Sequence, residues 1–241
     1  EIRFCDWSSD VCSSDLDLPW VCGGCSDERG FSEGSQPMGI FRPVHLIVTN
    51  DVRIEPFGIH AWADIKNGMV DLKINASIKS YSNRKRTIDI IHQLVDAKGN
   101  LIKETATKKE FNESDSLTLH INILISQYPN IKLWSVENPY LYKIISVIKE
   151  NNVIVDKAET DFGFRTINWK NGSNQFSLNG KPVFINGVAE YEHLLGQSHA
   201  FSKEQIISRM NWLKMAGFNA FRDGHQPHNL LYPVLDRKSV V

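Results

Sequence analysis

The feature that most constrains the fold of this chain is a ten-residue stretch, 70–79, in which apolar and polar side chains alternate. Its apolar positions are Val70, Leu72, Ile74, Ala76 and Ile78, and a polar or charged residue lies between each of them. Successive side chains of a β-strand point to opposite faces, so a period of two residues is typical of a strand with one buried face. The stretch therefore predicts a half-buried strand.

Similar apolar patterns recur along the middle of the chain, at 88–95, 117–123, 141–148 and 153–158. Turn-forming Gly and Asn residues follow the first of these patterns, and Asn151 and Asn152 separate the last two as a hairpin turn. Strands at this spacing over the 105 residues from 62 to 166 predict an antiparallel sandwich of immunoglobulin-like size. No nucleophile, base and acid are grouped here, so we expect this part to be structural.

After about Trp169 the pattern changes. Asn179 and Gly180 predict the turn of a small hairpin within 176–188, which leads into a buried strand at 183–187. Ser202 and Gln205 have the spacing of a capping box at the start of a helix.

Apolar residues then recur at helical spacing, at Ile206, Met210 and Leu213, and Gly217 lies where a glycine commonly ends a helix. A strand at 218–222 and a helix at 230–235 are predicted next. Strand, helix, strand, helix is the order of a parallel sheet or of a βα barrel.

Polar side chains gather where the two predicted parallel strands end. Residues 190–193 (Glu-Tyr-Glu-His) follow the first strand, and residues 223–226 (Asp-Gly-His-Gln) follow the second. In βα barrels the chemistry lies at the C-terminal ends of the strands, so these two clusters form the candidate site. Glu190 and Glu192 lie on one segment and cannot flank a scissile bond, so we reject them as a pair of glycosidase carboxylates.

Two residues of these clusters have alternative interpretations. The guanidinium of Arg222 either holds a catalytic carboxylate ionised or forms a salt bridge to Asp223 or Glu192 without chemical consequence. His225 either hydrogen-bonds a sugar hydroxyl or is an ordinary loop histidine. A metal pair of His225 and His228 is disfavoured, because no third ligand is evident and the intervening proline opposes helical geometry.

Charge and composition exclude several classes of protein. The 27 basic and 28 acidic side chains give a net charge of −1, which offers no electrostatic footprint for nucleic acid or an anionic membrane. No apolar run approaches the roughly 18 to 20 residues of a membrane-spanning helix.

All four cysteines lie near the N-terminus, at Cys5, Cys12, Cys22 and Cys25. The last two have the spacing of a zinc knuckle or a redox pair, but no second ligand pair follows, and free thiols in an irregular segment are the favoured interpretation. We expect residues 1–16 and the residues from about Arg237 onward to be non-native. Residues 1–16 lack the pattern of a signal peptide, so the sequence leaves the localisation open.

Five ordered motifs resemble glycoside hydrolase family 2, the group of the β-galactosidases, β-glucuronidases and β-mannosidases. They are 39–44 (GIFRPV), 133–142 (LWSVENPYLY), 162–165 (FGFR), 176–181 with 187–188, and 217–222 (GFNAFR) with 225–227. The resemblance implies a mainly β chain: 17–60 as the tail of a jelly-roll sugar-binding domain, 61–167 as an immunoglobulin-like β-sandwich, and 168–241 as the first βα units of a truncated (β/α)8 barrel. Such a barrel needs about 200 residues, whereas 73 residues follow position 168.

Carried over by this resemblance, Arg222 lies beside the family's nucleophile and orients it, and His225, Tyr191 and Glu192 contact the substrate. Tyr191 stands at a position that is usually histidine, and Gln226 at one that is usually tyrosine. The preferred sugar is therefore open among galactose, glucuronic acid and mannose, with galactose as the first expectation.

The family's mechanism is retaining, with one glutamate as acid/base and a second as nucleophile, both well downstream of the second barrel strand. No Asn-Glu pair follows position 176. We therefore expect both catalytic glutamates, and the ligands of the divalent metal that the family often uses, to lie outside these residues, so that no metal is assigned and the chain alone is inactive. A β-glycoside is the expected partner. The alternative is a non-catalytic carbohydrate-binding or scaffold sandwich, which has no need of the barrel motifs.

Overall fold

The computed structural model describes residues 44, 46–66, 69–82, 85–111, 114–124, 131–169, 175–190, 202–223 and 231–238. The chain divides into two compact units. One contains residues 47–185, and the other contains residues 186–241 together with 1–46. The four cysteines, and residues 17–43 and 45 of the expected jelly-roll tail, lie outside the described residues.

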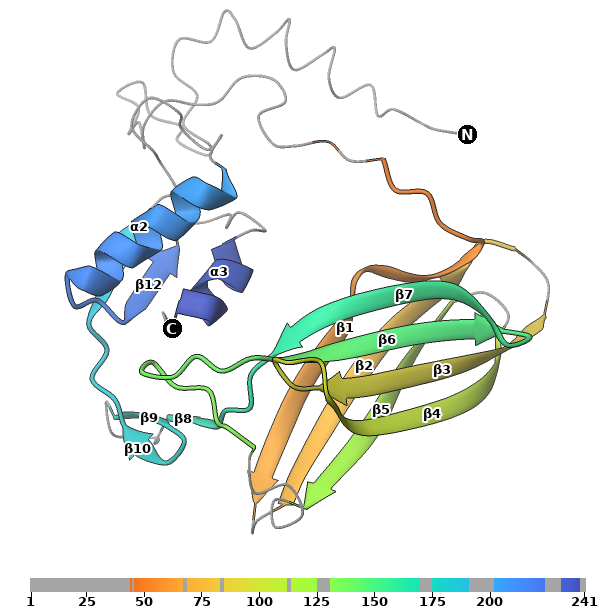
Figure 1. Cartoon of the computed structure of the whole chain (residues 1–241), viewed down its shortest axis with the longest axis horizontal. Coiled ribbons are helices and arrows are strands. Elements are labelled where there is room, and N and C mark those ends of the chain that lie inside the picture. The colour runs from red at the N-terminus through yellow and green to blue at the C-terminus, as the bar shows by residue number, and fades with distance from the viewer. Residues whose placement is uncertain are drawn as a thin grey trace, which may run out of the picture. The chain divides into compact units, whose positions relative to one another are not determined.

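The first unit contains a β-sandwich of two antiparallel sheets (Figure 1). One sheet has the order β1-β2-β5 and is formed by β1 (Val52–Lys66), β2 (Met69–Ser80) and β5 (Ser114–Leu124). The other has the order β4-β3-β6-β7 and is formed by β3 (Arg86–Val95), β4 (Leu101–Phe111), β6 (Tyr142–Glu150) and β7 (Val153–Phe162). Every predicted strand of this region is confirmed. The sandwich already includes residues 52–60, which belong to β1.

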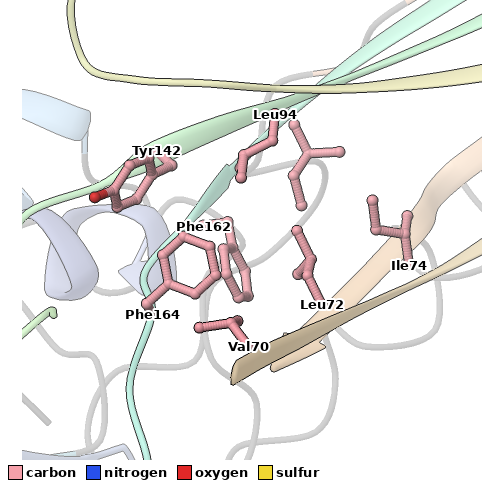
Figure 2. Packing of buried hydrophobic residues seen from close by; sticks show 8 residues of the cluster. Val70, Leu72, Ile74, Leu94, Tyr142, Phe162 and Phe164 are labelled. Atoms are coloured by element: carbon pink, nitrogen blue, oxygen red, sulfur yellow. The ribbon is translucent and has the colours of Figure 1, made fainter. Parts of the chain in front are cut away.

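The alternating pattern of β2 is the origin of the core. Val70, Leu72 and Ile74 are completely buried, whereas the residues between them are partly exposed. Figure 2 shows these three side chains facing Leu94 of β3, with aromatic rings beside them. Full burial of one such aliphatic side chain contributes about 2 kcal/mol, so the pattern itself determines which face of the strand turns inward.

Asparagine and glycine form the tight turns for a steric reason. Asn151 and Asn152, between β6 and β7, have φ of 51° and 65°. Asn179 and Gly180, in the later hairpin, have φ of 53° and 76°. Two-residue turns of this hand need positive φ at both positions, which asparagine and glycine tolerate best. Both predicted hairpins are confirmed.

A polar pair interrupts the aliphatic core. His92 of β3 and Ser146 of β6 are paired in register, and both are buried. The Nδ1 atom of His92 lies 2.7 Å from Oγ of Ser146, and no hydrogen-bond partner for its Nε2 atom is found among the described residues. Burial lowers the pKa of His92 from 6.5 to about 4, so the imidazole is neutral at neutral pH.

A small antiparallel sheet follows the sandwich in the same unit. Its order is β10-β9-β8, with β8 (Ile167–Trp169), β9 (Phe176–Leu178) and β10 (Lys181–Pro182). Phe176 and Leu178 bury the indole of Trp134, which is only 2% exposed. The side chain of Asn179 donates to the carbonyl of Trp134 and accepts from the backbone N–H of Thr166. These contacts hold the small sheet against the motif at 133–142.

The second unit contains a β-α-β arrangement followed by a helix (Figure 1). Strands β11 (Gly187–Glu190) and β12 (Ala220–Asp223) pair in parallel, and α2 (Lys203–Met215) lies between them in the chain, with α3 (Leu231–Lys238) after them. The predicted capping box of Ser202 and Gln205 is present. Gly217, with φ of 89°, follows the helix as expected.

A separate small core joins the two helices. Ile206 and Met210 of α2 pack with Val234 and Leu235 of α3, and Phe221 of β12 packs against this cluster. The helical spacing read from the sequence therefore identified the buried side of α2.

The boundaries of the two strands differ from the prediction. The buried strand expected at 183–187 is wrong, because the strand begins only at Gly187 and Phe184 is 85% exposed. The N–H of Val183 donates to the carbonyl of Phe176 and thereby prolongs the preceding hairpin. Similarly, the N–H of Phe218 donates to the carbonyl of Leu213 and closes α2, so β12 starts two residues later than expected.

Candidate functional site

The register of β11 and β12 brings the first residues of the two predicted polar clusters, Glu190 and Asp223, to one edge of the sheet. Ala189 is paired with Arg222, and Glu190 with Asp223. Because the strands are parallel, the segments that follow Glu190 and Asp223 leave from the same, C-terminal edge. This is the edge of a βα sheet at which ligands bind and catalytic side chains gather.

The opposite edge is fastened by two asparagines. The side-chain oxygen of Asn219 accepts a 2.8 Å hydrogen bond from the N–H of Asn186, and the N–H of Asn219 donates to the carbonyl of Asn186 at 2.9 Å. The side-chain amide of Asn186 donates to the carbonyl of Gly217 at 3.0 Å. These bonds set the register with which the two strands start, and so determine which residues meet at the other end.

Arg222 lies on the side of the sheet that faces away from the helices. Phe221 packs against the cluster of α2 and α3, and neighbouring residues of a strand point to opposite faces. Arg222 therefore shares the other face with Ala220 and Ala189, and it is exposed. Small neighbours leave room for the long guanidinium side chain above this face.

Of the four predicted site residues, the structure describes only Arg222. Tyr191, Glu192 and His225 lie outside the described residues, and for Asp223 only the backbone is placed. Both interpretations of Arg222, the carboxylate clamp and the simple salt bridge, involve these groups and stay predictions.

A metal centre would need several ligating side chains close together. Within the described residues no three His, Cys, Asp or Glu side chains are close enough to hold a metal ion. The spaced pairs Cys22/Cys25 and His225/His228 fall outside those residues. The described part of the chain therefore assigns no metal.

The reasoning from sequence missed the pair Asn186 and Asn219. The signal was available, because each asparagine directly precedes the first residue of one of the two parallel strands. An asparagine repeated at equivalent positions of two neighbouring strands can satisfy the backbone of both.

Sequence comparison places these elements in a known family. The profile of the glycosyl hydrolases family 2 matches residues 52–165, and the profile of that family's TIM barrel domain matches residues 169–241. Together the two matches cover more than three quarters of the chain. The chain belongs to glycosyl hydrolases family 2.

Individual relatives agree with this family. A β-galactosidase from Pseudoalteromonas haloplanktis is 28% identical over 236 residues, which are 95% of this chain and 20% of the relative. The crystal structure of a family 2 member from Bacteroides cellulosilyticus superimposes with a TM-score of 0.75 at 23% identity, over 85% of this chain and 28% of that one. The crystal structure of a β-glucuronidase from Bacteroides uniformis superimposes with a TM-score of 0.75 at 20% identity, over 85% of this chain and 25% of that one. The chain thus spans about a fifth of the length of the first relative and about a quarter of these family 2 structures.

Two of the motifs that resemble the family pack against each other in this structure. The stretch 133–142 supplies Trp134, and Gly163 and Arg165 of the stretch 162–165 both lie against its side chain. A side chain at Gly163 would meet Trp134 at 3.0 Å, and the guanidinium carbon of Arg165 lies 4.7 Å from the ring centroid. None of the helices that the structure describes is long and apolar enough to cross a membrane.

Proposed function

We propose that this chain is the central part of a retaining glycoside hydrolase that cleaves β-glycosides, with β-galactosides as preferred substrates. The observation that carries the proposal is the parallel register of β11 and β12, which places Glu190 and Asp223, the residues that precede 191–193 and 224–226, at one edge of the sheet while both helices pack on one face. This is the start of a barrel rather than a feature of a binding module. The relative from Pseudoalteromonas haloplanktis, a β-galactosidase, supports galactose as the sugar.

In this proposal each of three parts of the chain has one role. Residues 17–51 are proposed as the tail of a jelly-roll domain, 52–167 form the sandwich that includes β1, and 168–241 are proposed to begin the barrel. The contacts of Trp134 and Asn179 fasten the small sheet to the sandwich. The acid/base and the nucleophile come from barrel strands outside these residues, so this chain binds one side of the sugar and performs no hydrolysis.

Arg222 is proposed as a positioning residue for the nucleophile. A guanidinium beside a carboxylate favours its ionised form, which is the form that attacks the sugar. His225, Tyr191 and Glu192 are proposed to bind sugar hydroxyls beside it. Each of these roles rests on family resemblance and on the shared edge of β11 and β12.

The first test uses this chain as it is. Assays with nitrophenyl β-galactoside, β-glucuronide and β-mannoside should give no hydrolysis above buffer. Sequencing the gene beyond codon 241 should show a frame that continues through two further barrel-strand glutamates. Turnover by this chain alone, or a stop codon directly after Val241, would contradict the proposal.

The second test addresses Arg222 in the full-length enzyme. R222Q should lower kcat about 100-fold, and it should move the acidic limb of the kcat/KM profile to higher pH, because the nucleophile then loses its neighbouring positive charge. K214A, which removes an exposed cation from the last turn of α2, is the matched control. An acidic limb that stays in place in R222Q would assign Arg222 a purely structural role.

A further inference from the structure

The outer face of the sheet β1-β2-β5 carries a mixture of groups that the proposed barrel site does not use. Alternation along β1 directs His60, Trp62 and Asp64 outward, opposite to the buried face. Trp62 is 38% exposed, and its ring lies beside that of His60, with centroids 5.2 Å apart and planes inclined by 36°. Two adjacent aromatic rings therefore form a small platform on the outer face of this sheet.

Polar groups surround this platform on the neighbouring strand. Lys73 is the cross-strand partner of Trp62, and Asn75 is the partner of His60. The ammonium of Lys73 donates to Asp64 at 2.6 Å and lies 3.8 Å from Asp71. An amide, an ammonium group and two carboxylates thus lie next to the rings.

The third strand continues the pattern at the level of register. Thr118, His120 and Asn122 of β5 are paired with Asn75, Lys73 and Asp71, respectively. The three cross-strand rows therefore contain no aliphatic residue. They extend roughly 14 Å along the strands and roughly 10 Å across them, which is room for a short oligosaccharide.

The chemistry of this face suits a sugar better than a protein. A flat protein partner would have to remove water from the ion pairs of Lys73, which costs more than the pairs return. Among the described side chains of this face, exposed Trp62 and Met69 are separated by the row of Asp64 and Asp71 and form no continuous apolar patch that would compensate. A pyranose requires less desolvation than a protein. One aromatic ring packs against its C–H groups, and polar side chains donate to and accept from its hydroxyls, while part of the sheet surface stays hydrated. Within the described side chains, the carboxylates of Asp64 and Asp71 are balanced by the ammonium groups of Lys73 and Lys66, so this part of the face has no net charge to attract a uronic acid.

We propose that the outer face of β1-β2-β5, centred on Trp62 and His60, is a second carbohydrate-binding site that takes a neutral oligosaccharide or polysaccharide chain. The site lies in the sandwich and does not involve the barrel edge. Its function is to hold a glycan, and no bond is made or broken there.

The test is native gel electrophoresis of the full chain in gels that contain β-1,4-galactan, laminarin or galactomannan as neutral probes, with polygalacturonate as the anionic probe. At least one neutral polymer should retard the wild type. W62A should weaken this binding about tenfold, and H60A should weaken it less. W212A is the matched control, because Trp212 is 71% exposed on α2 and should leave retardation unchanged.

Several outcomes would overturn the proposal. They are absence of retardation by every neutral polymer, equal retardation of W62A and wild type, or retardation by polygalacturonate alone. Circular dichroism should show that W62A is still folded at the temperature of the gel, so that weaker retardation reports the loss of the ring and not unfolding. Binding is measured without turnover, so its result is independent of the nitrophenyl assays that test the barrel.

Discussion

The phenol oxygen of Tyr142, the first residue of β6, accepts a 2.7 Å hydrogen bond from the backbone N–H of Lys132, ten residues earlier in the chain. This is the tyrosine corner of immunoglobulin-like sandwiches, in which a tyrosine at the start of this strand fixes the connection that precedes it. The ring itself is buried and packs edge-on against Tyr140 and Phe164. Burial raises the pKa of its hydroxyl, so the bond is present at every ordinary pH.

Replacing this tyrosine by phenylalanine should destabilise the sandwich by about 1 to 2 kcal/mol, because the N–H of Lys132 is left without its partner while the ring stays packed. Two measurements check this: the midpoint of urea unfolding, and the rate of hydrogen exchange of the β6 amides in the absence of denaturant. Y140F is the matched control, because the hydroxyl of Tyr140 accepts only a long, exposed bond of 3.4 Å from Ala97. Equal losses in both variants would mean that the corner bond contributes nothing specific.

Gly163 should not tolerate a side chain. A Cβ atom there would lie 3.0 to 3.1 Å from three atoms of the buried Trp134 side chain. G163A should therefore displace the indole and cost about 1 to 3 kcal/mol. Because Phe176 and Leu178 pack on the same indole, amide exchange in β9 should accelerate in this variant.

The matched control for that experiment is G99A. Gly99 has φ of 86° and no described atom within 4 Å of an added Cβ, so its replacement costs only backbone strain in the turn after β3. Exchange in β9 should stay as in the wild type. Faster exchange of β9 in G99A as well would show that it reports global stability rather than contact with Trp134.

His92 should make the sandwich acid-sensitive. Its pKa is about 4 in the fold, where burial disfavours the charged imidazole, and 6.5 in the unfolded chain. The unfolded state therefore binds more protons between these values, so stability is complete above pH 6.5 and falls as the pH decreases toward 4. The slope should approach 1.4 kcal/mol per pH unit, with a total loss of up to about 3 kcal/mol.

The double variant H92V/S146A removes both members of the buried pair, so that neither is left without its partner. Its unfolding free energy should lose the dependence on pH between 6.5 and 4 that the wild type shows. G99A, which changes the turn after β3 and removes no titratable group, is the control and should leave the slope unchanged. A slope that persists in H92V/S146A would assign the acid sensitivity to other groups.

Local patterning was enough to predict the strands, because a period of two residues and positive-φ turn residues act over a few positions. The same patterning could not reveal that His92, inside the apolar run 88–95, is in the core rather than at an edge, since this depends on a partner from β6. The strand expected at 183–187 failed for a related reason. Its apolar residues resemble a buried strand. However, the backbone of Val183 is still hydrogen-bonded to the preceding hairpin and that of Phe218 to the end of α2, so β11 and β12 pair only from Gly187 and Ala220 onward.

For the candidate site, too, the sequence predicted one part and could not reveal another. The βα order predicted that polar residues would meet at one edge, and the pairing of Glu190 with Asp223 confirms this for the strand ends. The register that produces it depends on the side chains of Asn186 and Asn219, whose partner is 33 residues away. Contacts over such separations are set by tertiary structure and leave little trace in local sequence.

Asn219 should therefore control the pairing of β11 with β12. N219L keeps the approximate size of the side chain but removes the oxygen that accepts from the N–H of Asn186, and it should cost about 1 kcal/mol. N219D retains an acceptor oxygen and should behave nearly as the wild type. The measurement is hydrogen exchange of the amides of β11 and β12 in the full chain, which should accelerate severalfold in N219L while exchange in β6 of the sandwich is unchanged. Equal acceleration in N219D and N219L, or none in either, would show that this hydrogen bond does not set the register.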